Sequence, residues 1–251
     1  SNKNYKSHIG PVPGKVKFCE FNNSKHLKKL INKKTVAIII EFVQGDGGIN
    51  ICTKEFAKTI KEICKKRKIL LIADEIQGGI GRTGKIFAYK HYGVSPDIIT
   101  SAKGLGSGIP IGATIVKKEI SQNINIGFHG STFGGGMLQT RVAYNVFKTI
   151  NKTSFLKNVK SKGMLLEQLL NNLHSKNDFI KEVRIKGLMA GIEFKNSELA
   201  LKIYKETSDH GLVTTLVKGT TIRITPPLII KSEEIKRGIK IISDCLDKIK
   251  N

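Results

Sequence analysis

Short apolar runs alternate with amphipathic stretches along the first part of this 251-residue chain. The runs over 36–43, 69–73 and 97–102 are each typical of a buried strand. The first of them is nearly unbroken, which indicates a strand covered on both faces of a parallel sheet. Between the first two runs, apolar residues recur every three or four positions over 56–64, which predicts a helix capped by Thr53. Strand, helix and strand in this order predict a right-handed βαβ unit.

The pattern changes near residue 154, where longer helical periodicities begin. The elements expected beyond it are helices over 154–173, 197–210 and 232–249 and strands over 182–194, 213–217 and 221–225, the first of them broken by Gly187. We therefore predict an α/β fold with two domains. Residues 1–153 would form the C-terminal portion of a large domain with a mostly parallel sheet, and residues 154–251 a small C-terminal α+β domain.

Composition narrows the class of protein. The formal charge of +23 raises a nucleic-acid hypothesis, but the excess is nearly all lysine spread over every predicted helix, so we expect no nucleic-acid partner. The four cysteines lack metal or redox spacing and are interpreted as core thiols of a reducing compartment. We find no signal-peptide pattern and no apolar run near 18 residues. These features predict a cytoplasmic protein with no metal site.

Two of the apolar runs end in ionisable residues, Asp74 and Lys103. Ligands of parallel sheets bind beyond the carboxyl ends of the strands, so both side chains should point into one crevice. A pyridoxal phosphate enzyme needs such a pair: a lysine that bonds to the cofactor and an aspartate that keeps its ring nitrogen protonated. Either residue alone would be interpreted as a surface lysine or a turn residue, so the prediction depends on the pair.

Glycine-rich loops accompany the pair. The loop over 78–84 is by itself a weak signal of a flexible turn. The loop over 129–136 combines glycines with hydroxyl side chains, and backbone N–H groups freed in this way suit a phosphate.

Five motifs resemble the class III aminotransferases, which are fold type I pyridoxal phosphate enzymes. In chain order they are EFVQGDGGI, ADEIQGGIGRTG, DIITSAKGLGSGIPIGA, HGSTFGG and IRITPPLII. The resemblance covers essentially the whole chain, and the stretch FAYKHYGVSPDIITSAKGLG is most similar to the acetylornithine branch of the family.

The resemblance implies a role for individual residues. Lys103 matches the catalytic lysine that bonds to the cofactor, Asp74 the aspartate at the ring nitrogen, and Gln77 the residue near the cofactor's 3-oxygen. The residues implied to bind the cofactor are Asp74, Glu75, Ile76, Gln77, Lys103 and Thr132. We also expect Lys103 to lie in a buried setting.

Three further residues are implied to bind substrate, namely Ser131, Arg223 and Asp46. Arg223 matches an arginine that meets a substrate carboxylate or pairs with an acidic gate, and Thr132 is implied to serve the partner subunit's site in a homodimer. Asp46 stands where the family usually has glutamate, one methylene longer. We expect its pair with Arg223 to be longer or to need backbone movement.

Family members also carry an N-terminal segment with a phosphate loop, an aromatic residue stacked on the cofactor and an arginine for the α-carboxylate. None of these motifs is present in the 251 residues, so we expect a fragment or a truncated product with exposed apolar surface, weak cofactor binding and little turnover.

The function implied is transfer of the terminal amino group of N-acetylornithine to 2-oxoglutarate, a step of arginine biosynthesis. Related amino donors are succinyldiaminopimelate, ornithine and 4-aminobutyrate, and the sequence does not separate them. The alternative from another class is an inactive remnant that acts as a binding protein.

Overall fold

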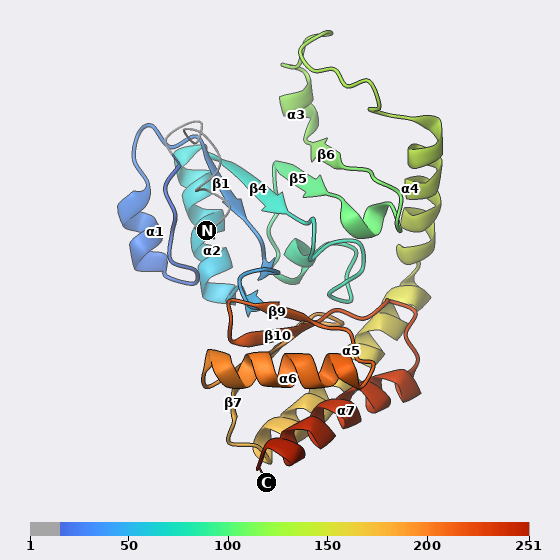
Figure 1. Ribbon diagram of the computed structural model, residues 1–251. Helices are drawn as coiled ribbons and strands as arrows, with labels where there is room; N and C mark the ends of the chain where they lie inside the picture. The colour runs from blue at the N-terminus through green and yellow to red at the C-terminus, as the bar shows by residue number, and fades with distance from the viewer. Residues whose placement is uncertain (1–15, 251) are drawn as a thin grey trace.

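A four-stranded sheet organises the first part of the chain. The computed structural model describes residues 16–250 (Figure 1). The strands, in the order in which they lie in the sheet, are β1 (Ala37–Ile40), β4 (Leu70–Asp74), β5 (Ile98–Ser101) and β6 (Ala113–Val116). The first three are parallel and β6 is antiparallel to β5. The prediction of a mostly parallel sheet is confirmed.

One face of this sheet is covered by α1 (Ser24–Leu30) and α2 (Lys54–Arg67). Thr53 caps α2 as predicted, because its Oγ1 accepts a hydrogen bond from the Phe56 N–H at 3.1 Å. Lys68 then ends the helix in the left-handed conformation, and β4 follows. The side chains buried beneath these helices include Ile40, Phe56, Ile60, Leu71 and Ala73.

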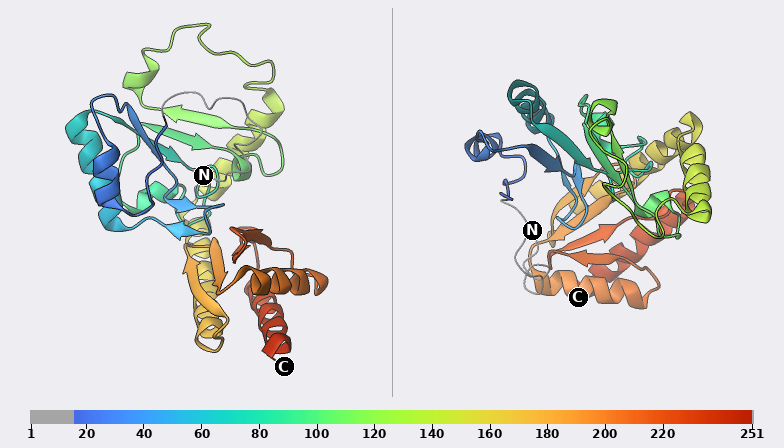
Figure 2. Two further views of the ribbon diagram at one scale, coloured as in Figure 1. Left: turned by 60° about the vertical axis from the view of Figure 1, so that its left-hand side comes forward. Right: turned by 90° about the horizontal axis from the view of Figure 1, so that it is seen from above.

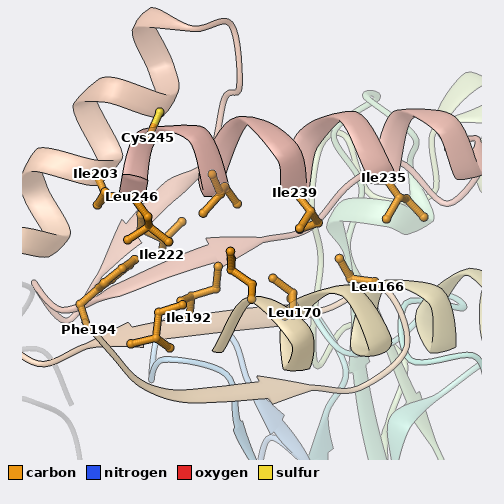
Figure 3. Packing of buried hydrophobic residues seen from close by; sticks show 14 of the residues in the cluster. Leu166, Leu170, Ile192, Phe194, Ile203, Ile222, Ile235, Ile239, Cys245 and Leu246 are labelled. Atoms are coloured by element: carbon orange, nitrogen blue, oxygen red, sulfur yellow. The ribbon is translucent and has the colours of Figure 1, made fainter. Parts of the chain in front are cut away.

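A second sheet is antiparallel throughout. Its strands, in spatial order, are β7 (Ile180–Ile185), β8 (Ala190–Phe194), β10 (Thr221–Ile224) and β9 (Thr215–Val217). Its helices are α5 (Thr153–Ser175), α6 (Ser197–Asp209) and α7 (Ser232–Lys250). Figure 3 shows the resulting core, in which Ile192, Phe194 and Ile222 of the strands meet Leu170 of α5 and Leu246 of α7.

The remaining elements lie outside the two four-stranded sheets and the helices that cover them. They are β2 (Val43–Gln44), β3 (Asn50–Ile51), α3 (Lys118–Ser121), α4 (Met137–Ile150) and the short 3-10 helices η2 (Ala88–His91) and η3 (Lys103–Leu105). Figure 2 shows the second sheet and its helices at one end of the molecule and the first sheet at the other.

Two predicted strands are divided. The run over 36–43 holds β1 and then β2, with Glu41 and Phe42 between them. The run over 182–194 breaks at Gly187, which has a φ of 62° and was expected to interrupt it. The proposed division into domains at residue 154 falls in the first turn of α5 and stays a prediction.

Among residues 16–250, no helix is long and apolar enough to cross a membrane. In the same part of the chain, no group of three histidine, cysteine or acidic side chains could hold a metal ion. All four cysteines are free thiols, and three of them are buried.

Candidate active site

Asp74 is the last residue of β4 and lies beside Thr100 of β5 in the parallel register. Its Oδ1 accepts a hydrogen bond from the Ile76 N–H at 3.0 Å and another from the Thr100 hydroxyl at 3.4 Å. The two bonds hold the carboxylate at the carboxyl edge of the sheet, where parallel sheets bind ligands. Neither of them uses Oδ2.

Lys103 follows β5 and begins η3. Its φ is 47°, which lies in the left-handed region that is unfavourable for residues with a Cβ. Backbone strain of this kind is concentrated at functional sites. The expected buried setting is wrong, because Lys103 is exposed in this chain. The loop that carries it is fixed by Leu105, which is buried in a cluster with Ile80 and Phe87.

A cavity of about 750 Å³ lies between the two sheets. Four of the predicted site residues line it: Ile76, Gln77, Lys103 and Arg223. The first three come from loops at the carboxyl edge of the first sheet, whereas Arg223 comes from β10 of the second. The structure therefore brings together residues that are more than a hundred positions apart in sequence.

Asp46 reaches this group through two polar contacts. Its Oδ1 lies 2.6 Å from Arg223 Nη1 and accepts a bond of 3.2 Å from Gln77 Nε2. Arg223 Nη1 also donates to Gln77 Oε1 at 3.2 Å. The hydrogen bond from Arg223 holds the pKa of Asp46 below its ordinary value.

Of the two alternatives expected for the Asp46–Arg223 pair, the longer distance is wrong, because the two side chains lie 2.6 Å apart. The backbone makes up for the shorter side chain, because Gly45 lies so close to Gln77 that a Cβ there would meet the Gln77 amide at 2.1 Å. Gly48 adds a positive φ of 97° to the same turn. A side chain at position 45 would therefore displace the Gln77 amide, which bonds to both Asp46 and Arg223.

Glu41 is a site residue that the sequence reasoning missed. It follows β1 directly and, in the register of β1 and β4, lies next to Asp74. Its Oε2 accepts a hydrogen bond from the Gly45 N–H at 3.0 Å, so it anchors the turn that carries Asp46. The signal was available, because Glu41 ends an apolar run just as Asp74 does, but it was hidden inside a run interpreted as one longer strand.

The charges that affect the pKa of Glu41 belong to three of the predicted site residues, Asp74, Asp46 and Lys103. Burial raises the pKa of its carboxyl, and the charges of Asp74 and Asp46 raise it further. The Gly45 N–H and the charge of Lys103 oppose that change. Glu41 and Asp74 also line a second hollow, of about 370 Å³, beside β1.

Glu75 is not brought to the cavity, although it was implied to bind the cofactor. Its side chain is fully buried, and its two carboxylate oxygens accept hydrogen bonds from the N–H groups of Ala88 at 2.7 Å and Tyr89 at 2.8 Å. The side chain therefore fixes η2 against the loop after β4. Burial raises the pKa of Glu75 to about 7, against the opposing effect of the two N–H donors.

This raised pKa gives a prediction for stability. A carboxyl that is protonated more readily in the folded state stabilises the fold below its unfolded pKa of about 4.3, and this contribution is lost as the pH rises through about 7. We expect the unfolding free energy of the wild type, relative to Glu75→Gln, to fall by up to about 3 kcal/mol over that interval. Denaturant unfolding of both proteins at several pH values measures it. A relative stability that rises with pH would mean that the two N–H bonds outweigh burial.

Ser131 and Thr132 are not brought to the cavity of their own chain. They lie in the segment 121–135, in which every residue is exposed. In Figure 1 this segment stands out beyond α3 and β6. The implied role of Thr132 in the cofactor site of a partner subunit stays a prediction.

Arg82 links the two halves of the cavity and was also missed. Its Nη1 donates to the carbonyl of Leu188 at 3.3 Å and to that of Pro226. Arg82 is mostly buried, and burial lowers its pKa. By holding the loop after β10, it fixes Arg223 relative to Lys103.

Comparison with known proteins assigns this arrangement to a family. The model of the family "Aminotransferase class-III" matches residues 1–246, so the chain belongs to the class III aminotransferases. The acetylornithine aminotransferase of Methanocaldococcus jannaschii is 40% identical over 98% of the chain, which covers 61% of that protein. A succinylornithine transaminase of Yersinia pseudotuberculosis is 36% identical over 98% of the chain and 60% of its own length.

Solved structures agree with this assignment. An ornithine aminotransferase of Toxoplasma gondii matches all of the chain with a TM-score of 0.92 and 27% identity, over 60% of its own length. The report of that structure describes partial occupancy of pyridoxal phosphate at its active site. The chain thus has the α/β fold of this family and spans about three fifths of the relatives it matches.

Pyridoxal phosphate is the cofactor of the family, and the described residues fit it. The cofactor needs an amine for a covalent bond and a carboxylate at its ring nitrogen. Lys103 offers its amine to an open cavity, and Asp74 is fixed through Oδ1 with Oδ2 left out of both bonds. Gln77 lies on the wall of the cavity that Lys103 lines, whereas Asp74 lines the neighbouring hollow beside β1.

Proposed function

We propose that this protein is a pyridoxal phosphate-dependent aminotransferase that moves the terminal amino group of N-acetylornithine to 2-oxoglutarate. The observation that carries the proposal is the convergence of Lys103, Gln77 and Arg223 on one cavity, with Asp46 bonded to the last two. The 40% identity to an acetylornithine aminotransferase supports the choice of donor.

The roles of the residues follow from their chemistry. When bound, the cofactor supplies an electron sink for the carbon that carries the amino group. The carboxylate of Asp74 holds a proton on the cofactor's ring nitrogen. Lys103 holds the cofactor, and its free amine moves the proton of the substrate carbon. Gln77 orients the group near the cofactor's 3-oxygen.

Arg223 receives a substrate carboxylate in this proposal. A guanidinium binds a carboxylate through two parallel hydrogen bonds, which gives both affinity and orientation. Asp46 occupies Arg223 first and must give way when 2-oxoglutarate enters. Ser131 contacts substrate from the exposed segment.

Asp46→Ala tests this exchange. Because 2-oxoglutarate no longer competes with a carboxylate on the protein, we expect it to bind about two- to fivefold more tightly, as suits an ion pair whose carboxylate is 65% exposed. The measurement is a titration of the aminated enzyme with 2-oxoglutarate, followed by the cofactor's absorbance. Asp209→Ala, on α6, is the control and should bind as the wild type does. Equal or weaker binding by Asp46→Ala would contradict the role given to Arg223.

The donor is tested by single-turnover half-reactions at saturating cofactor. We expect N-acetylornithine to aminate the cofactor faster than succinylornithine, ornithine, succinyldiaminopimelate or 4-aminobutyrate. Faster amination by a different donor would leave the assignment as an aminotransferase intact and would change the proposed substrate. Absence of a reaction with every donor would favour the inactive remnant that acts as a binding protein.

We also propose a homodimer in which Thr132 serves the partner's cofactor. The exposed segment supports this, because it carries large apolar side chains that its own chain leaves uncovered: Ile126, Phe128 and Phe133, with Phe133 83% exposed. Exposed apolar clusters of this kind mark interaction surfaces.

Phe133→Asp is expected to convert the dimer into a monomer, since a charge would be buried in the interface. Light scattering with size-exclusion chromatography gives the mass. Val213→Asp changes an equally exposed apolar residue outside the segment and should leave the dimer intact. The same mass for Phe133→Asp and the wild type would contradict this assembly.

The proposal also includes a domain boundary and a cellular location. We place the boundary between a large and a small domain at residues 153 and 154, because separate cores lie on either side of it. We place the protein in the cytoplasm, since its free cysteines suit a reducing compartment.

A further inference from the structure

Two arginines of the second sheet lie in one row, on either side of a glycine. Arg184 of β7 pairs with Gly191 of β8, and Gly191 pairs with Arg223 of β10. Directly paired residues point to the same side of a sheet, so both arginine side chains start from the same face. The opposite face carries Ile192 and Ile222, which are buried in the core with α5 and α7. The two arginines therefore face away from that core.

The turn of the β2–β3 hairpin, residues 45–49, packs on the glycine of this row. A Cβ on Gly191 would meet Ile49 Cγ1 at 3.0 Å and the carbonyl oxygen of Gly48 at 3.2 Å. A glycine within a strand is typical of such a close approach by another backbone. Ile49 is fully buried at this contact and packs in a cluster with Met189. The hairpin turn thus lies directly against the second sheet.

The two arginines bond to the hairpin turn at points only two residues apart. Arg223 pairs with the carboxylate of Asp46. Arg184 donates a hydrogen bond from Nε to the carbonyl of Gly48 at 2.8 Å. The turn that carries Asp46 is therefore held by one arginine through a side chain and by the other through the backbone.

The backbone of the turn is strained where Arg184 bonds to it. Ile49 has a φ of 59°, although a β-branched side chain makes the left-handed region unfavourable. Such a conformation persists only where the surrounding contacts enforce it. The carbonyl of Gly48 belongs to the peptide group that leads into Ile49. The bond from Arg184 therefore fixes the peptide group on which the conformation of the turn depends.

Arg184 is itself held in place by its neighbours in the second sheet. Its side chain is 11% exposed, and its Nη1 pairs with Glu193 at 2.6 Å and with Glu182. Its Nη2 donates to the Thr221 hydroxyl at 3.5 Å. Glu193 has a second partner in Lys181 at 2.7 Å. With the bond from Nε, all three nitrogens of the guanidinium have partners, an arrangement that a single ammonium group cannot reproduce.

We propose that Arg184 is a positioning residue that holds Asp46 against Arg223. It acts through the backbone of the hairpin turn and has no direct contact with Asp46 among the hydrogen bonds and ion pairs described above. By fixing the turn, it determines how strongly Asp46 competes with a substrate carboxylate for the guanidinium of Arg223. This consequence for the substrate rests on the proposed function, whereas the positioning of Asp46 does not.

Arg184→Lys tests the positioning directly. Lysine keeps a positive charge beside Glu193 but has no Nε donor for the carbonyl of Gly48. The hydrogen bond from Arg223 is the main cause that lowers the pKa of Asp46. We therefore expect the pKa of Asp46 to rise toward its ordinary value in the variant. Carboxyl-carbon NMR of the 251-residue chain, titrated without cofactor or substrate, measures this pKa.

A second variant displaces the same turn and leaves the ion pairs of Arg184 intact. In Gly191→Ala the new methyl group presses on Ile49, so the pKa of Asp46 should again rise. Arg67→Lys is the matched control, because Arg67 is an exposed arginine in the last turn of α2, and this variant should leave the pKa unchanged. An unchanged pKa of Asp46 in Arg184→Lys or Gly191→Ala would overturn the proposal.

Binding of 2-oxoglutarate to the aminated enzyme gives a second readout. Arg184→Lys should bind it about two- to fivefold more tightly, as expected for Asp46→Ala. The double variant should bind it no more tightly than Asp46→Ala alone, because the carboxylate that Arg184 positions is then absent. Additive effects of the two substitutions would overturn the proposal. A raised pKa of Asp46 in Arg184→Lys, with no binding of 2-oxoglutarate by the wild type, would support the positioning role and contradict the proposed function.

Discussion

Lys103→Ala is expected to slow the amination half-reaction by about 10²–10⁴-fold relative to the wild-type chain. The amine of Lys103 has two tasks in the account above, namely to hold the cofactor and to move the proton of the substrate carbon. Alanine removes both, whereas the cavity walls formed by Gln77 and Arg223 remain. Rapid mixing of the cofactor-saturated variant with N-acetylornithine, followed by absorbance, measures the rate.

The control for this variant is Lys202→Ala, which removes an exposed lysine from α6 and should react as the wild type does. Lys103→Arg separates the two tasks further, because arginine keeps the positive charge but stays protonated and cannot accept the proton. We expect it to be as slow as the alanine variant. A rate within about twofold of the wild type for either Lys103 variant would remove Lys103 from the chemistry.

Asp74→Asn is expected to lower the rate of the same half-reaction by about 10²–10³-fold, in the range found when one electrostatic contact to the reacting system is lost. Asparagine can still accept the bonds from the Ile76 N–H and the Thr100 hydroxyl through its Oδ1. The variant therefore keeps the local structure and loses the negative charge that holds the proton on the ring nitrogen.

Asp97→Asn is the matched control for Asp74→Asn. Asp97 immediately precedes β5, where Oδ2 accepts from the Leu71 N–H at 2.8 Å and Oδ1 pairs with Lys117 at 2.7 Å. Its loss should reduce stability and leave the half-reaction rate unchanged. Equal rates for Asp74→Asn and the wild type would contradict the role of this carboxylate in holding the proton on the cofactor's ring nitrogen.

The periodic parts of the fold were predictable because local chemistry determines them. The Thr53 cap, the α2 stripe and the break at Gly187 were all visible in the sequence. The antiparallel direction of β6 was not, because a four-residue strand has no directional signal. Exposed apolar surface was expected, but its place on one face of the first sheet was hidden, since the run of β1 is as apolar as that of a strand covered on both sides.

Site residues that follow the end of a strand could be predicted from the sequence. Distances between side chains could not be predicted where the backbone of a turn determines them. The same rule that selected Asp74 also applies to Glu41, yet the apolar residues after Glu41 concealed it. The pair of Asp46 and Arg223 was expected to be longer or to need backbone movement, because side-chain length can be seen in a sequence and the approach of the Gly45 backbone cannot. The burial expected for Lys103 is not found among residues 16–250, where its side chain lines an open cavity.

The most direct test of the central claim is reduction of the chain with borohydride in the presence of pyridoxal phosphate, followed by peptide mapping. This chain has 37 lysines, so a selective result is informative. The account predicts one principal pyridoxyl adduct, on the peptide that contains Lys103, and its loss in Lys103→Ala. An adduct concentrated on any other lysine, or one spread evenly over the exposed lysines, would contradict it.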